Sequence, residues 1–492
     1  MVLNRPRLRA AGCAAIALVV AVSAVSAAVR PPKLQYEIST LSNGLTVATS
    51  EDHSTPIVHV NLTYHVGSKN ERAGRTGFAH LFEHLMFKGS KNVLPEAHTS
   101  FIASVGGQSN AFTTEDETTF WETVPSQYLP LALWLEADRM ATLRIDKDTF
   151  TNEREVVKEE RRMRVDNQPF GRLNELLYEQ AFSVHPYKHA TIGSMTDLEA
   201  ASVDDVRDFY QTFYVPSNAT LTIVGDFEAA QVMKLVNETI GRVPKAAREV
   251  PRDIPKEPAH TREKRVTLQQ PVPLPAVVVA YHITYDGNPD SYPLHIAAKV
   301  LSDGQSSRIY KKLVYEKQMA VAAFGSANLI EDPNLFYAVG IVQPGHTPQE
   351  VAETLIAEID RLKTEPITEH ELQRTKNQFS RDYILGRETV QQKASVLSHA
   401  VVIHRDIKTA DGEYDIFQNI TAADVQRVAR TYFTSENRVV MTLLPVGTAG
   451  LGRQGMNGAT EPQSRGEKEE GHPVESTRLG VSVPLSPWGA RQ

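Results

Sequence analysis

The chain has 492 residues, of which 41% are apolar and 23% charged, and its formal net charge is −7 at pH 7. This length is sufficient for two or three domains, and the composition is typical of a globular protein rather than a disordered one. The acidic excess argues against nucleic acid as the main partner. The single cysteine, Cys13, excludes an internal disulfide and a thiolate zinc cluster.

The first segment, residues 1–27, has the features of a signal peptide. Basic residues precede an apolar run over 10–29, and Val25-Ser26-Ala27 fits a small-residue cleavage site. Cleavage would place the mature protein in the periplasm or outside the cell. The run is also about long enough to span a bilayer, so an N-terminal membrane anchor is the alternative.

Residues 34–243 are expected to form a first domain in which strands and helices mix. Alternating or β-branched segments predict strands, and an apolar stripe at helical spacing predicts a helix. The expected strands are 45–49, 58–66, 118–124 and 219–226, and an expected helix is 129–140.

A second domain of similar plan is expected at 273–446, after a linker at 244–272 that is rich in proline and charge. Its predicted elements are a strand at 276–283, a helix at 290–301 and a strand at 438–445. The fold class is therefore α+β, with two similar domains that each pack a mainly antiparallel sheet with helices. Residues 447–492 have no apolar period and are expected to be a disordered tail.

The stretch H-L-F-E-H at 80–84 lies within an expected helix over 76–88. Its apolar residues fall at i, i+3, i+4, i+7 and i+8 and form one stripe. Thr76 is suited to cap the start of this helix, and Gly89 is suited to its C-terminal end.

His80, Glu83 and His84 share the opposite side of that helix. Two imidazoles one turn apart can bind one Zn²⁺ through a nitrogen each. A carboxylate between them is placed to take a proton from water rather than to bind the metal. The alternative is that two histidines occur in this helix by chance.

A third ligand is expected from a charged helix over 146–164. One face, expected to point inward, combines two carboxylates with two valines, namely Glu153, Val156, Val157 and Glu160. The opposite face, expected to point to solvent, carries Glu155, Lys158, Glu159 and Arg162. Helical phase therefore favours Glu160 or Glu153 as the ligand, while a buried salt bridge to arginine or lysine is the alternative role for both.

H-L-F-E-H followed by E-R-E-V-V-K-E-E resembles the inverted-motif zinc metallopeptidases, the family of pitrilysin, insulin-degrading enzyme and mitochondrial processing peptidase. Further stretches at 106–114, 185–193, 213–226 and 306–313 resemble the family in order, so the likeness covers residues 35–445 and is closest to the single-unit bacterial and mitochondrial members. The resemblance implies a zinc endopeptidase with one Zn²⁺ per chain.

The resemblance also implies a role for each residue of the motifs. His80, His84 and Glu160 would bind the metal, Glu153 would support them, and Glu83 would be the catalytic base. The strand of Ser109, Asn110, Ala111, Phe112 and Thr113 would pair with an extended substrate through backbone hydrogen bonds. Substrates would then be peptides or unfolded protein segments. The alternative for this strand is an ordinary β-hairpin.

One departure from the family concerns the second domain. Many members place there an arginine and, seven residues later, a tyrosine that stabilise the developing oxyanion, whereas this chain has Val314 and Val321 at those positions. Arg308 and Tyr310 have the wrong spacing and order. We therefore expect a heterodimer with a related subunit that lacks H-x-x-E-H and supplies the Arg/Tyr pair, with a homodimer as the alternative. A non-catalytic structural or peptide-binding subunit is the other class of function, but the complete motif argues against it.

Overall fold

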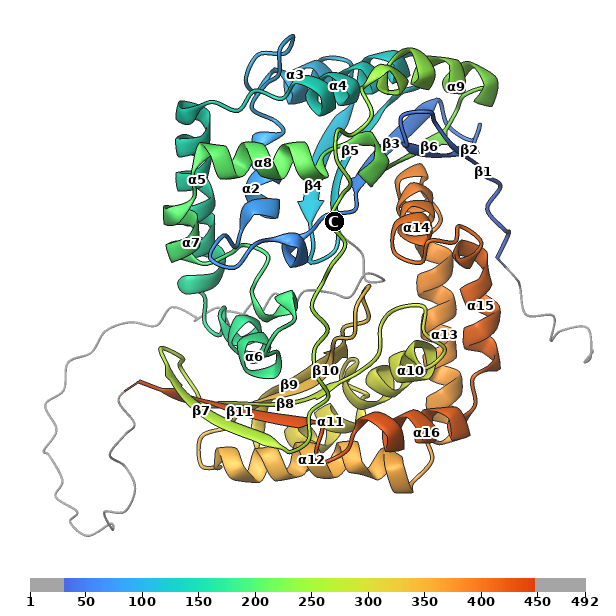
Figure 1. Ribbon diagram of the computed structural model, residues 1–492. Coiled ribbons are helices and arrows are strands. Elements are labelled where there is room, and N and C mark those ends of the chain that lie inside the picture. Colours follow the sequence, from blue (N-terminus) through green and yellow to red (C-terminus); the bar gives the residue numbers. More distant parts are fainter. Residues whose placement is uncertain (1–30, 447–492) are drawn as a thin grey trace, which may run out of the picture. The chain divides into compact units, whose positions relative to one another are not determined.

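Two β-sheets, one in each half of the chain, organise residues 31–446, the part that the computed structural model describes (Figure 1). Helices pack on both sheets, so the expected α+β fold is confirmed. The expected signal peptide, 1–27, and the expected tail, 447–492, lie outside the described residues. Within 31–446 no helix is both long and apolar enough to cross a membrane.

The first sheet has six strands in the order β1-β2-β6-β3-β5-β4. Its neighbours are antiparallel except for the parallel pair β2 and β6. The central strands are buried on both faces, as the continuous apolar and β-branched composition of β6 requires. The strands are β1 (Glu37–Thr40), β2 (Thr46–Glu51), β3 (Ile57–Tyr64), β4 (Gln108–Thr113), β5 (Thr118–Pro125) and β6 (Ala219–Gly225).

The helices of this half confirm the expected helix at 129–140, which is α4. Short 3₁₀-helices and one π-helix, η3, lie between the longer elements. The helices are α2 (Phe78–Leu85), α3 (Ala97–Ser104), α4 (Leu129–Thr142), α5 (Lys147–Arg161), α6 (Leu173–Ala181), α7 (Met195–Ala200), α8 (Val203–Phe213) and α9 (Ala229–Glu238), with η1 (Ser68–Asn70), η2 (Ser126–Tyr128), η3 (Arg162–Asp166), η4 (Pro186–Lys188), η5 (Pro216–Asn218) and η6 (Ile240–Arg242).

The second sheet repeats five strands of the first in the order β7-β11-β8-β10-β9. Here β7 and β11 are parallel, as β2 and β6 are, and the other neighbours are antiparallel. The internal repeat is therefore visible as a shared sheet topology. The strands are β7 (Lys264–Gln270), β8 (Ala276–His282), β9 (Ala320–Ala327), β10 (Leu335–Val342) and β11 (Arg438–Pro445).

Helix α10 follows β8 as α2 follows β3, which confirms the expected helix at 290–301. The remaining helices include three long ones, α12 to α14, with polar N-caps at their starts. The helices of this half are α10 (Ser291–Ser302), α11 (Arg308–Tyr310), α12 (Pro348–Thr364), α13 (Glu369–Leu385), α14 (Val390–Val402), α15 (Thr409–Asn419) and α16 (Ala422–Tyr432), with η7 (Lys311–Glu316).

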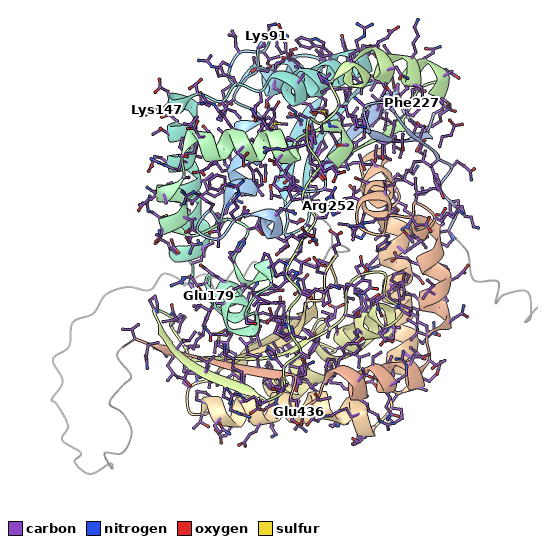
Figure 2. The ribbon with its side chains drawn as sticks, viewed as in Figure 1. Lys91, Lys147, Glu179, Phe227, Arg252 and Glu436 are labelled. Carbon is purple, nitrogen blue, oxygen red and sulfur yellow. The ribbon has the colours of Figure 1, made fainter. Side chains whose placement is uncertain are left out.

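The connection between the halves is shorter than the linker expected at 244–272, because β7 lies inside that range. The sequence signal for β7 is weak, since it is an edge strand with four exposed residues and therefore has little apolar alternation. Residues 244–263 contain no helix or strand. Arg252 on this segment, labelled in Figure 2, donates to the backbone oxygen of His65 and to Asn218 Oδ1 at 3.3 and 2.5 Å.

The two halves share buried contacts. Helix α6, from the first half, packs Leu176 and Leu177 against the second sheet, whose facing side chains include Val278 and Met441. In the opposite sense, α14 from the second half contacts β3 and β6. Residues far apart in sequence therefore belong to one packed unit.

Lys69 forms the centre of a buried ion network between the halves. Its Nζ lies 2.9 Å from Asp116, 2.7 Å from Glu331 and 2.9 Å from Asp332, and its side chain is only 5% exposed. Burial alone would lower the pKa of Lys69, but the three carboxylates hold it above its usual value. The ammonium group therefore stays charged and compensates carboxylates from both halves.

We predict that Lys69→Met destabilises the protein by about 3–5 kcal/mol, because it leaves buried carboxylates without their cation. Urea unfolding followed by circular dichroism measures the change. The matched control is Lys312→Met, which removes an exposed pairing with Glu316 and should leave the unfolding midpoint nearly unchanged. Equal midpoints for the wild type and Lys69→Met would contradict the prediction.

Candidate metal centre

Helix α2 is fixed by the core through one face. Phe78, Leu81, Phe82 and Leu85 are at most 2% exposed, and the Phe82 ring stacks on Tyr214 with ring centroids 4.8 Å apart. These contacts leave the opposite side for His80, Glu83 and His84, which are partly exposed as the helical pattern predicts.

The start of α2 differs from the expectation. The helix begins at Phe78 rather than at residue 76, because Gly77 adopts a φ of 93° that only glycine takes readily. Thr76 does not cap it; its hydroxyl donates to Asp197 Oδ2 at 2.6 Å. Instead the buried carboxylate of Glu71 accepts the backbone N–H groups of Gly77 and Ala79 at 2.9 and 2.8 Å. Sequence reasoning missed Glu71, which lies outside the usual capping positions.

The end of α2 also comes earlier than expected. The helix ends at Leu85, and Gly89, with a φ of 98°, lies in the turn that follows it. Gly89 is close to the backbone of Val93 and Pro95, so a side chain there would clash. This glycine therefore reverses the chain but does not cap the helix.

Helix α5 lies beside α2 (Figure 1) and brings its carboxylates toward the two histidines. Glu153 is 6% exposed, and Glu160 is half-buried. Two parts of the expected helical phase are wrong, because Val156 is 48% exposed and Lys158 is buried. At 100° per residue the buried arc is centred near Val157 rather than between the two valines, so Val156 turns outward and Lys158 inward.

One oxygen of Glu160 meets both imidazoles. Glu160 Oε2 lies 3.2 Å from His80 Nε2 and 3.3 Å from His84 Nε2, and the two ring centroids are 5.0 Å apart. Two ligands bound at ~2.0–2.1 Å to a tetrahedral ion are separated by about 3.3 Å. The three side chains therefore fit a zinc ion with one further position left for water or substrate.

Negative charge surrounds these imidazoles. Hydrogen bonds from His80 and His84 hold the pKa of Glu160 far below its usual range. Burial alone would lower the pKa of His84, but Glu153 and Glu160 raise it to about 9. The carboxylates of Glu153 and Glu160 thus favour a cation bound between the two histidines.

Three further contacts hold the polar groups of the site in place. Glu153 Oε2 lies 3.6 Å from His84 Nδ1, and its other oxygen lies 3.2 Å from Lys88 Nζ. The hydroxyl of Thr113 donates to Glu83 Oε2 at 2.7 Å. The contact of Thr113 links the end of strand β4 to the carboxylate between the histidines, and no sequence motif indicated it.

The strand predicted to bind substrate, Ser109 to Thr113, is β4, and it forms the edge of the first sheet. It pairs only with β5, from Gln108 opposite Thr123 to Thr113 opposite Thr118. Its other edge is therefore free of strand pairing in the described sheet. The structure places the end of this edge strand next to Glu83, through the hydrogen bond of Thr113.

The second half offers no Arg/Tyr pair at the aligned positions. Val314 is half-buried on η7, and Val321 is 44% exposed on β9. Arg308 is engaged elsewhere, because its Nε and Nη2 donate to the carboxylate of Glu371 at 2.7 and 2.8 Å. Arg308, which its spacing had already excluded, is therefore also engaged in an ion pair with Glu371.

The chain belongs to the M16 peptidase family. Residues 46–195 match the model described as insulinase, peptidase family M16, and residues 200–379 match the model described as peptidase M16 inactive domain. The chain is 30% identical over 416 residues to the zinc protease PqqE of Helicobacter pylori, covering 84% of this chain and 93% of that protein. The family expected from the motifs is thus confirmed.

Other relatives agree with this assignment. The chain is 23% identical to the mitochondrial-processing peptidase subunit beta of Lentinula edodes, covering 80% of this chain and 87% of that one. A crystal structure of a protease from Helicobacter pylori matches with a TM-score of 0.80 and 29% identity, covering 84% of this chain and 100% of that one. The first half of the periplasmic protease PqqL of Escherichia coli has the same fold, with a TM-score of 0.69 and 18% identity over 85% of this chain and 93% of that one.

The geometry predicts different roles for three glutamates of α5. We expect Glu160→Gln to lose most bound zinc, because its carboxylate oxygen faces both imidazoles. Glu153→Gln should lower zinc affinity by a smaller factor of roughly 10–100. Glu159→Gln is the matched control, since Glu159 is exposed and pairs with Arg162. Zinc affinity measured by competition with a chromogenic chelator tests all three, and loss of zinc in Glu159→Gln alone would show that the assignment is wrong.

Proposed function

We propose that this protein is a zinc-dependent endopeptidase that hydrolyses peptides or unfolded protein segments. The observation that carries the proposal is the meeting of His80, His84 and Glu160 around one point, with Glu83 on the same helix face. Membership of the M16 family and the zinc protease names of its relatives support it.

In this proposal His80, His84 and Glu160 hold Zn²⁺, and Glu153 orients His84 through its Nδ1 side. The metal, when bound, would polarise the scissile carbonyl and make water more acidic. Glu83 accepts the proton of the attacking water and passes it to the leaving amine. Thr113 fixes the carboxylate of Glu83 by its hydrogen bond. No serine or cysteine nucleophile is required.

Strand β4 is the proposed substrate-binding edge. Its position at the end of the sheet supports pairing with an extended peptide through Ser109, Asn110, Ala111, Phe112 and Thr113. Pairing through the backbone tolerates many sequences, so it suits peptides and unfolded segments. The hydrogen bond from Thr113 to Glu83 would align a paired peptide with the catalytic carboxylate.

The non-catalytic alternative draws its support from two names. One solved structure, 14% identical over 84% of this chain, is described as a peptidase M16 inactive domain, and so is one matching family model. That match covers residues 200–379, whereas H-L-F-E-H lies at 80–84 within the other match. The name of the family model therefore applies to the half in which no zinc motif was expected, and the solved structure, at 14% identity, is evidence of the fold alone.

We predict that Glu83→Gln keeps zinc and loses activity by 10²–10⁴-fold, because the amide cannot accept the proton of water. Zinc content and cleavage of a fluorogenic peptide are measured on one preparation. Glu159→Gln serves as the control and should cleave like the wild type. Cleavage at the wild-type rate by Glu83→Gln would exclude Glu83 as the base.

We further propose that the active form is a heterodimer with a related subunit that lacks H-x-x-E-H. Val314 and Val321 cannot donate a hydrogen bond to an oxyanion, and losing one such donor costs about 10²–10³ in turnover. One relative is named as the beta subunit of a processing peptidase, which agrees with a subunit role. A homodimer that uses other donors is the alternative.

The chain purified alone should therefore show weak peptidase activity, at least 10²-fold below that of the chain co-purified with a motif-less relative from the same genome. Light scattering gives the size of each preparation, and a Glu83→Gln version of the pair controls for contaminating proteases. Full activity of the isolated chain would refute the partner requirement and leave the zinc assignment intact.

The proposed location is the periplasm or the exterior of the cell. It depends on the features of residues 1–27 and agrees with the periplasmic description of a protein of the same fold.

A further inference from the structure

A second cluster of metal-ligand side chains lies in the other half of the chain. Asp286 follows strand β8, His399 lies near the end of α14, and His404 follows that helix. Their ligand atoms all lie within 4.8 Å of one another. None of these residues belongs to the H-x-x-E-H site or to the motifs that identify the family.

The geometry of this cluster matches that of the first site. Asp286 Oδ2 lies 2.9 Å from His399 Nε2 and 3.1 Å from His404 Nε2, just as one oxygen of Glu160 faces two Nε2 atoms. The two imidazole centroids are 5.0 Å apart, the same separation as at the first site. In both places a single carboxylate oxygen and two Nε2 atoms surround one point.

The side chains of the second cluster are held in this orientation. His404 Nδ1 lies 2.8 Å from the hydroxyl of Thr409, so its Nε2 is left to face Asp286. Asp286 Oδ1 accepts the backbone N–H of Gly287 at 2.9 Å, so its Oδ2 faces the histidines. Gly287 has a φ of 81°, and a Cβ there would lie 3.3 Å from the His404 ring. A side chain at position 287 would therefore crowd the His404 ring.

The charge of the second cluster also suits a cation. Asp286 is only 9% exposed, and among the described residues it forms ion pairs only with the two histidines. A contrasting cluster of His98, Glu122 and Glu136 is already filled by Arg139, whose guanidinium lies 3.2 Å from Glu122 and 2.8 Å from Glu136. Beside Asp286 the described chain places no lysine or arginine in that role.

We propose that Asp286, His399 and His404 bind a second divalent metal ion. Two imidazoles and one carboxylate form a ligand set typical of Zn²⁺, and the side chain of His399 is 23% exposed. The inference does not depend on the peptidase proposal, because no residue is shared between the two sites.

A metal here would have a structural role. It would join the segment after β8 to α14, and α14 in turn contacts the first sheet. Ser398, next to His399, lies 2.8 Å from Thr63 of β3 through their hydroxyl groups, and Lys393 pairs with Asp52. The ion would thus hold the helix that joins the two halves.

Metal counting tests the proposal on the full chain without a histidine tag. The protein is produced with added zinc, passed over a chelating resin, and analysed by mass spectrometry for zinc per chain. We expect two equivalents for the wild type and one for the His80→Ala, His84→Ala double variant, whose second cluster is untouched. Asp286→Asn and His404→Gln should each also retain one equivalent, and combining Asp286→Asn with the double variant should leave none.

His346→Gln is the matched control, because His346 is a surface histidine 3.8 Å from Glu350 and belongs to neither cluster; it should keep two equivalents. Circular dichroism confirms that each variant is folded. Cobalt substitution gives a second readout, since the visible absorption per chain should halve in Asp286→Asn. A folded double variant that holds no metal would overturn the proposal and show that Asp286 and the histidines form only a hydrogen-bonded network.

Discussion

The fixed orientation of α2 is the constraint on which the rest of the candidate site depends. Eight residues of helix must bury an apolar face in the first core and present three polar side chains on the other side. The aromatic contacts of Phe82 hold the first face, and Glu71 holds the first backbone N–H groups. A rotation of the helix by one residue would move each polar group by 100° and take the imidazoles apart.

The second requirement is that carboxylates from elsewhere in the chain reach the imidazoles. Helix α5 supplies Glu160 and Glu153, and the end of β4 supplies the hydroxyl that holds Glu83. Each of these groups would be costly to bury without a partner. They satisfy one another through the histidines and Lys88, so the same contacts that balance charge also set the geometry for a metal.

The repeated sheet topology explains how the two halves of one chain come to differ in chemistry. In each half a helix follows a central strand of the sheet. Helix α2 follows β3, which pairs with β6, and α10 follows β8, which pairs with β11. Like α2, helix α10 packs an apolar face into its core, and most of its residues are buried. Helix α10 carries no H-x-x-E-H motif. Its half therefore lacks the first site and instead contains the Asp286 cluster.

Local patterns in the chain were enough to predict the family, the α+β class, most strands and the helix face that His80, Glu83 and His84 share. This was possible because helical and strand periodicities are local properties of the chain. The sequence located Glu160 and Glu153 but misplaced Val156 and Lys158, since the phase of a helix against its neighbour depends on how the two helices pack. The edge strand β7 was also missed, because an exposed edge carries little apolar alternation.

Contacts between residues distant in sequence could not be predicted, because they depend on how the whole chain packs. Glu71 at the start of α2, Thr113 against Glu83, and the meeting of Asp286 with His399 and His404 have no signature in residue spacing. Each joins side chains from separate elements, and the sheet order that brings those elements together is set by the packing of the whole core. Residue spacing along one helix can predict which side chains of a motif share a face. The residues that contact those side chains from other elements depend on the fold.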